Sequence, residues 1–111
     1  MTTENLTKIY GEKRAADSVS LHIKKGDVYG LIGRNGAGKT TILKMICGLS
    51  CPTSGSITFE GKTGAELSKQ MHKIGSLIET PGLFPKMSAY QNIKIKCILC
   101  GKNDDAYIKS L

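Results

Sequence analysis

The 111-residue sequence has no tryptophan, and aromatic residues make up only 5% of it. No apolar run approaches the roughly 20 residues that cross a bilayer as a helix, and the polar N-terminus lacks the features of a signal peptide. We therefore expect a cytosolic chain whose association with a membrane would come through a partner. The shortage of aromatic side chains also argues against a dedicated nucleic-acid surface.

Acidic residues are also scarce: 9 Asp and Glu stand against 16 Lys and Arg, which gives a net charge of +7. The lysines are scattered from Lys8 to Lys109 without a dense run, which again does not indicate a nucleic-acid face. A polyanionic nucleotide and a nearby anionic membrane would account for the excess charge. An incomplete chain whose acidic part is missing would also account for it. The length suits one domain.

The four cysteines, Cys47, Cys51, Cys97 and Cys100, are expected to be reduced in a cytosolic protein. Their i, i+4 and CxxC spacings admit a zinc site with four thiolate ligands. However, no glycine or proline lies inside the CxxC and no aromatic residue flanks it. The sequence therefore favours small buried hydrophobic residues over metal binding or redox chemistry.

A glycine-rich segment, Gly33-Arg34-Asn35-Gly36-Ala37-Gly38-Lys39-Thr40, is followed by Thr41 and fits the phosphate-binding P-loop pattern GxxxxGK[ST]. Its glycines let backbone N–H groups converge on phosphate oxygens. Lys39 can reach the β- and γ-phosphates, and the Thr40 hydroxyl suits Mg²⁺. The motif predicts binding of a nucleoside triphosphate, whereas the alternative is a glycine-rich turn with a solvated lysine.

The sequence on both sides of this segment favours the P-loop. The apolar run 28–32 is typical of a central parallel strand, and a helical pattern that Gly48 would end follows the loop: Ile42, Met45, Ile46 and Leu49. A strand, a glycine loop and a helix in this order place phosphates at a helix N-terminus, where free N–H groups and the macrodipole favour anions.

The remaining pattern predicts an α/β protein with a P-loop NTPase core and an antiparallel β subdomain. We expect an edge strand at 6–10, an alternating strand at 18–23 with His22 on its polar face, a strand at 56–60 that pairs with them, and a strand at 74–78. Capping boxes at 63–66 and 88–91 predict helices that begin there. Residues 106–111 are expected to start another helix.

With these motifs in place, residues 5–111 resemble the N-terminal half of an ABC transporter ATP-binding domain, in particular the bacitracin and lantibiotic export type. Four features occur in the family's order: the segment 6–11, the loop 33–41, the turn at Pro52, and the segment 74–92. The resemblance implies that residues 1–111 form the N-terminal part of one nucleotide-binding domain.

The resemblance also implies roles for individual residues. Tyr10 would stack on adenine, although a tyrosine in a strand is more often an ordinary strand residue. Asn35 would lie beside the γ-phosphate, and the phosphate and Mg²⁺ residues would be Gly36, Ala37, Gly38, Lys39, Thr40 and Thr41. Glu79 stands where most of the family has the glutamine of the Q-loop. It would join Thr40 at the metal, and the alternative is a solvated loop carboxylate.

Nothing after Glu79 matches the family's signature LSGGQ, its second acidic strand, its catalytic glutamate or its switch histidine. We therefore assign no catalytic residue and expect ATP and Mg²⁺ to bind without turnover. The implied partners are a transmembrane permease subunit, which would hold the protein at the inner face of the membrane, and a second nucleotide-binding domain. A sheet truncated in this way predicts self-association through its open edge.

Two other functions remain open. The chain could be a nucleotide-binding or regulatory fragment that does not hydrolyse ATP. It could also be a different P-loop enzyme such as a small kinase, but Arg14 and Arg34 are the only arginines, which is too few for an arginine-rich lid.

Overall fold

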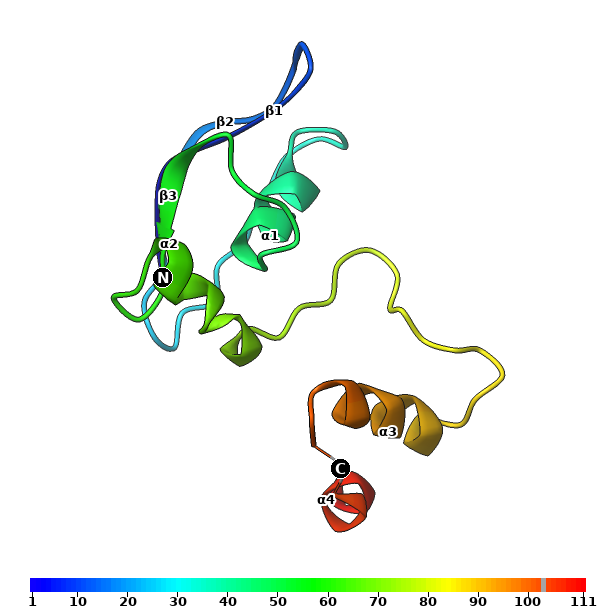
Figure 1. The fold of residues 1–111 in the computed structure, drawn as a ribbon. Helices are drawn as coiled ribbons and strands as arrows, with labels where there is room; N and C mark the ends of the chain where they lie inside the picture. The colour runs from blue at the N-terminus through cyan, green and yellow to red at the C-terminus, as the bar shows by residue number, and fades with distance from the viewer. Residues whose placement is uncertain (103) are drawn as a thin grey trace. The chain divides into compact units, whose positions relative to one another are not determined.

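A computed structural model describes residues 1–102 and 104–111 and divides the chain into two compact units, Met1–Glu79 and Thr80–Leu111. The first unit holds β1 (Thr2–Tyr10), β2 (Lys13–His22), α1 (Lys39–Ile46), β3 (Ser54–Thr58), α2 (Gly64–Ser68) and a short 3₁₀ helix (Met71–Lys73). The second holds α3 (Ala89–Leu99) and α4 (Asp105–Ser110). Figure 1 shows these elements along the chain.

The three strands form one antiparallel sheet in the order β2-β1-β3. The predicted pairing of the third strand is therefore confirmed, although β3 begins two residues earlier than expected. The prediction of an edge strand at 6–10 is wrong, because β1 starts at Thr2 and lies between the other two strands. His22 is exposed, as its place on the polar face of β2 predicted.

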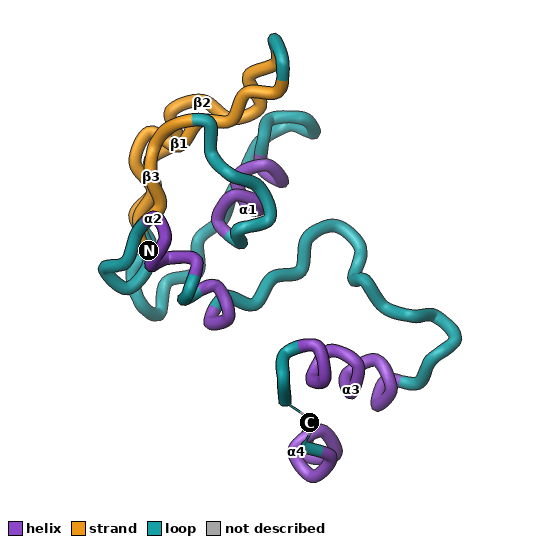
Figure 2. The backbone as a smooth tube through the Cα atoms, in the orientation of Figure 1, coloured by secondary structure: helices purple, strands orange, loops and turns teal. Residues whose placement is uncertain are grey.

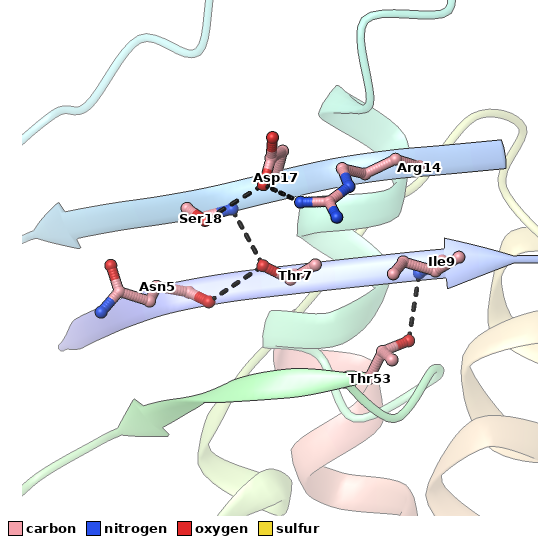
Figure 3. A network of polar contacts seen from close by, with 7 residues as sticks. All are labelled: Asn5, Thr7, Ile9, Arg14, Asp17, Ser18 and Thr53. Carbon is pink, nitrogen blue, oxygen red and sulfur yellow. Dashed lines mark hydrogen bonds and ion pairs between the residues drawn. The ribbon is translucent and has the colours of Figure 1, made fainter.

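Threonine hydroxyls form hydrogen bonds with backbone groups near the register shifts of this sheet (Figure 3). The pairing shifts register near Asn5 and Ser18, where the backbone adopts positive φ. There the Thr7 hydroxyl donates to the Asn5 carbonyl at 3.1 Å and accepts from the Ser18 N–H at 2.9 Å. The Thr53 hydroxyl accepts from the Ile9 N–H at 3.0 Å. Side-chain partners of this kind satisfy backbone groups that a bulge removes from the ladder.

The core of the first unit lies between the sheet and one face of α1 (Figure 1). Its buried side chains come from all three strands and the helix: Leu6, Ala16, Ile42, Met45, Ile46 and Ile57. The predicted apolar face of α1 is confirmed at its three helical positions, but Leu49 is 68% exposed. Gly48 explains the difference, because it adopts φ 71° and its N–H and that of Leu49 bond back to Met45 and Lys44, which ends the helix.

Two predicted strands do not form: the central parallel strand at 28–32 and the strand at 74–78. Figure 2 draws residues 28–32 and 74–78 as loop, and neither segment pairs with any strand of the described chain. Val28 and Ile32 are almost fully exposed, and Leu77 is 73% exposed. A parallel strand is stable when neighbouring strands and covering helices bury it, and an apolar sequence alone does not supply those neighbours.

The two capping boxes fare differently. Thr63 precedes α2 as predicted, but its side chain accepts no capping hydrogen bond. At α3 the box is complete, since the Ser88 hydroxyl accepts from the Gln91 N–H at 3.2 Å and the Gln91 side chain accepts from the Ser88 N–H at 2.8 Å.

Asn92 ties the loop before α3 to the helix, a role that the sequence did not reveal. The residue is 9% exposed, and its side chain accepts from the Phe84 N–H at 2.8 Å and donates to the carbonyls of Phe84, Met87 and Ser88 at 3.0–3.2 Å. These bonds use both ends of the amide.

Replacing Asn92 with leucine, which has a similar size, is expected to release residues 84–88. The loop would lose its hydrogen-bond partners, at a cost of about 1–3 kcal/mol for buried groups left unpaired. Hydrogen exchange at the Phe84 amide would accelerate. The matched control is Gln91→Leu, which removes only the capping contact, so equal exchange rates in the two variants would contradict this role.

None of the helices among the described residues has the length and apolarity required to cross a membrane. The cysteines divide between the units, with Cys47 and Cys51 in the first and Cys97 and Cys100 in the second. Cys51 and Cys100 are exposed, so the interpretation of all four as buried hydrophobic residues is wrong for these two.

Candidate nucleotide-binding site

The glycine-rich loop borders a cavity of about 210 Å³ in the first unit. One side of the cavity is formed by the loop and the first turn of α1, and the other by the start of β2. The lining residues are Lys13, Ala15, Asn35, Gly36, Gly38, Lys39, Thr40 and Thr41. The structure thus brings together six of the seven predicted loop residues, and Ala37 is the one that does not line the cavity.

Close backbone contact fixes the loop against β2. A Cβ atom placed on Gly38 would lie 2.0 Å from the Ala15 carbonyl oxygen, and Gly38 has φ 89°. Both the space and the backbone conformation therefore require glycine at this position. The contact makes β2 one wall of the cavity.

Lys39 turns its ammonium group back onto the loop. Its Nζ donates to the carbonyl of Gly33 and, at 2.7 Å, to that of Arg34. The Ala37 N–H also donates to the Arg34 carbonyl, at 3.0 Å. These bonds connect the two ends of the loop and keep its backbone close to the ammonium group.

The start of α1 presents unpaired N–H groups to the same cavity. The Ile42 N–H is the first in the helix to bond back, to the Gly38 carbonyl at 2.9 Å. The N–H groups before it therefore have no partner within the helix. The first turn carries no acidic residue. With the Lys39 charge and the positive end of the helix dipole, this arrangement suits an anion with several oxygens.

Tyr10 does not line the cavity. The residue is 50% exposed, its hydroxyl lies 3.4 Å from that of Ser50, and the Lys8 ammonium lies 5.0 Å from the ring centroid. Lys8 Nζ also donates to the Cys51 carbonyl at 2.6 Å. A lysine over one ring face leaves the opposite face for any further stacking partner.

Glu79 also lies outside the cavity lining, whereas Thr40, the other predicted metal ligand, is part of it. The Glu79 carboxylate is 3.9 Å from the Lys44 ammonium, and both side chains are well exposed. An exposed pair at this distance holds the side chain weakly. The Glu79 backbone has φ 61°, a strained conformation for glutamate.

Two lining residues, Lys13 and Ala15, were not among the predicted site residues. Lys13 pairs with Tyr10 across the hairpin turn, so it lies opposite a residue that was predicted to bind the nucleotide. The sequence did not indicate which strand would approach the loop. Arg14, the next residue, is engaged elsewhere: its guanidinium lies 2.6 Å from Asp17 and, together with the Ser18 hydroxyl, holds the pKa of the Asp17 carboxyl below its usual value.

The sequence profile of the ABC transporter family matches residues 16–110, which include the whole glycine-rich loop. The chain belongs to the ABC transporter family. The ABC match begins after Tyr10, Lys13 and Ala15, so the hairpin side of the cavity lies largely outside it.

Two transport ATP-binding proteins are similar to most of this chain. The bacitracin transport ATP-binding protein BcrA of Enterococcus faecalis is 46% identical over 100 residues, which are 89% of this chain and 32% of BcrA. The lantibiotic transport ATP-binding protein SrtF of Streptococcus pyogenes is 44% identical over 108 residues, 97% of this chain and 46% of SrtF. The chain thus spans 32% to 46% of the length of these relatives.

The fold of an ABC ATPase is also similar. A solved dimeric structure of the ATP-binding cassette MJ0796, in a post-hydrolysis state with ADP and Pi, aligns with a TM-score of 0.73 and 30% identity. The alignment covers 88% of this chain and 47% of that one. The α/β class with an antiparallel β subdomain, predicted from the sequence, is therefore confirmed.

Proposed function

We propose that this chain is the N-terminal part of the nucleotide-binding domain of an ABC exporter and that it binds Mg-ATP in the cavity beside α1. The observation that carries the proposal is the joint presence of Lys39, the unpaired N–H groups of the first helical turn and the loop glycines around one cavity. Charge and N–H groups that converge in this way bind polyphosphate.

In this proposal each loop residue has a defined task. The N–H groups of residues 36–41 would contact phosphate oxygens, for which the Ala37 N–H would exchange its bond to the Arg34 carbonyl. Asn35 would lie beside the γ-phosphate. Lys39 exchanges its contacts with the Gly33 and Arg34 carbonyls for phosphate oxygens, to which a charged donor bonds more strongly.

The oxygen donors near the cavity fit Mg²⁺, which binds few protein ligands and keeps phosphate and water oxygens around it. The Thr40 hydroxyl would be a direct ligand. Glu79 would contribute through a water molecule after it leaves Lys44, a weak pair that costs little to break. Bound Mg²⁺ would neutralise phosphate charge.

Hydrolysis and transport belong to the whole protein in this proposal. In the whole protein, a second nucleotide-binding domain and a transmembrane permease would complete the transporter at the inner face of the membrane. The names of BcrA and SrtF suggest peptide antibiotics as the exported class. The alternative is a nucleotide-binding or regulatory module, and ATP hydrolysis by a longer form of the chain would separate the two.

Calorimetric titration of the 111-residue chain with Mg-ATP tests the proposal. We expect one binding site per chain, with heat that disappears when sodium sulfate replaces the nucleotide at equal concentration. A chain that is folded by circular dichroism and shows no binding would overturn the proposed function.

Tyr10 is proposed to stack on adenine through the ring face opposite Lys8. Tyr10→Ala is then expected to weaken Mg-ATP binding about tenfold, because base stacking on an aromatic ring contributes roughly 1–3 kcal/mol. Tyr10→Phe keeps the ring and should bind as the wild type does. Tripolyphosphate has no base, so equal losses for tripolyphosphate and ATP in Tyr10→Ala would contradict stacking.

A further inference from the structure

We propose that Lys13 is a second cation of the nucleotide site and that it pairs with the phosphates shared by nucleoside diphosphates and triphosphates. This inference rests on the proposed function and adds to it a residue outside the glycine-rich loop. Lys13 would raise the affinity for ADP and ATP by the same factor.

The geometry of the hairpin places Lys13 at the cavity. Lys13 opens β2 and pairs with Tyr10 across the turn. Lys13 and Ala15 lie two residues apart at the start of β2, where the pairing with β1 shifts register between Arg14 and Ala16, and both line the cavity. The contact between the Ala15 carbonyl and Gly38 keeps this part of β2 against the loop. Backbone packing thus places residue 13 at the cavity, and only the flexible lysine side chain has to move to reach a phosphate.

The charges around the cavity favour this pairing. Lys13 and Lys39 are the charged residues of its lining, and no acidic residue of the described chain lines it or forms an ion pair with Lys13. The neighbouring Arg14 is occupied by Asp17 at 2.6 Å. A polyphosphate in the cavity would therefore meet two cations and no opposing carboxylate.

The direction of approach distinguishes the two lysines. Lys39 reaches the cavity from the loop, where its Nζ lies at the Gly33 and Arg34 carbonyls. Lys13 approaches from the hairpin that carries Tyr10, the side proposed for the base. A nucleotide that extends from hairpin to loop places its inner phosphates nearer Lys13 and its terminal phosphate nearer Lys39. The inner phosphates are common to ADP and ATP.

The test compares Lys13→Gln with Lys24→Gln, which removes the same charge from an exposed lysine away from this cavity. We expect Lys13→Gln to weaken Mg-ATP and Mg-ADP binding equally, by about threefold to tenfold, the range for an exposed charge pair with a phosphate. Lys13→Arg should restore binding. The loss should shrink between 50 mM and 500 mM KCl because salt screens an exposed pair.

Several outcomes would overturn the inference. Equal affinities in Lys13→Gln and Lys24→Gln would show that Lys13 makes no contact with phosphate. A loss confined to ATP would place it at the terminal phosphate, and a loss independent of salt would indicate a structural effect of the substitution. In each case, binding that still depends on Lys39 would leave the proposed function standing. A folded wild type that binds no nucleotide would overturn both.

Discussion

Replacement of Lys39 by alanine is expected to weaken Mg-ATP binding by at least about 100-fold. The ammonium group lies at the loop, where it donates to the Gly33 and Arg34 carbonyls, and each charged hydrogen bond to phosphate contributes roughly 1.5–3 kcal/mol. Loss of two such bonds accounts for the effect. The substitution also removes the donor held by the Gly33 and Arg34 carbonyls, so the loop loses an internal contact.

Lys44→Ala is the matched control for this experiment. It removes the same kind of side chain from the same helix, five residues further on, where the ammonium faces Glu79 at 3.9 Å and does not line the cavity. Titration calorimetry should give wild-type affinity for Lys44→Ala. Because alanine favours helices, neither variant should lose α1, which circular dichroism would verify. Similar affinities for both variants would remove Lys39 from the site.

The second large effect is expected for Gly38→Ala. The new methyl group would lie 2.0 Å from the Ala15 carbonyl oxygen and 3.1 Å from its carbon, and these backbone atoms belong to a strand of the sheet. Relief of the clash requires α1 and β2 to move apart. We expect a loss of about 2–4 kcal/mol in the free energy of unfolding, from overpacking together with the positive φ. Nucleotide binding should be lost with the loop geometry.

Gly36→Ala separates these two causes. Gly36 also lines the cavity and has a similar φ of 83°, but a Cβ there would meet nothing within 4 Å. Gly36→Ala should therefore lower the free energy of unfolding only by the strain of alanine at positive φ, about 1–2 kcal/mol. Urea unfolding followed by circular dichroism would measure both variants. If the two variants prove equally unstable, the close contact between Gly38 and Ala15 does not contribute to the loss of stability.

Local features of the sequence predicted much of this structure. The glycine loop, the buried face of α1, the stop at Gly48 and the capping box at Ser88 each depend on residues within a few positions of one another. Backbone geometry within one or two helical turns decides such features, and sequence patterns report it directly.

Features that depend on distant segments were predicted poorly. Residues 28–32 have the composition of a central strand, yet no described strand pairs with them, because parallel pairing needs partners elsewhere in the chain. The same reason explains why Lys13 was missed. Its place in the site follows from the approach of Ala15 in β2 to Gly38, which lies more than 20 residues further along the chain, and no local pattern encodes that approach.

The contact between Gly38 and β2 has a consequence for sequence variation. Because the partner of Gly38 is a main-chain carbonyl oxygen, most residues at position 15 can supply it, whereas only glycine fits at position 38. One half of the contact is therefore visible as a motif and the other half leaves no trace in a sequence. Libraries that randomise position 15 should yield many folded chains, and those that randomise position 38 should return almost only the parent residue.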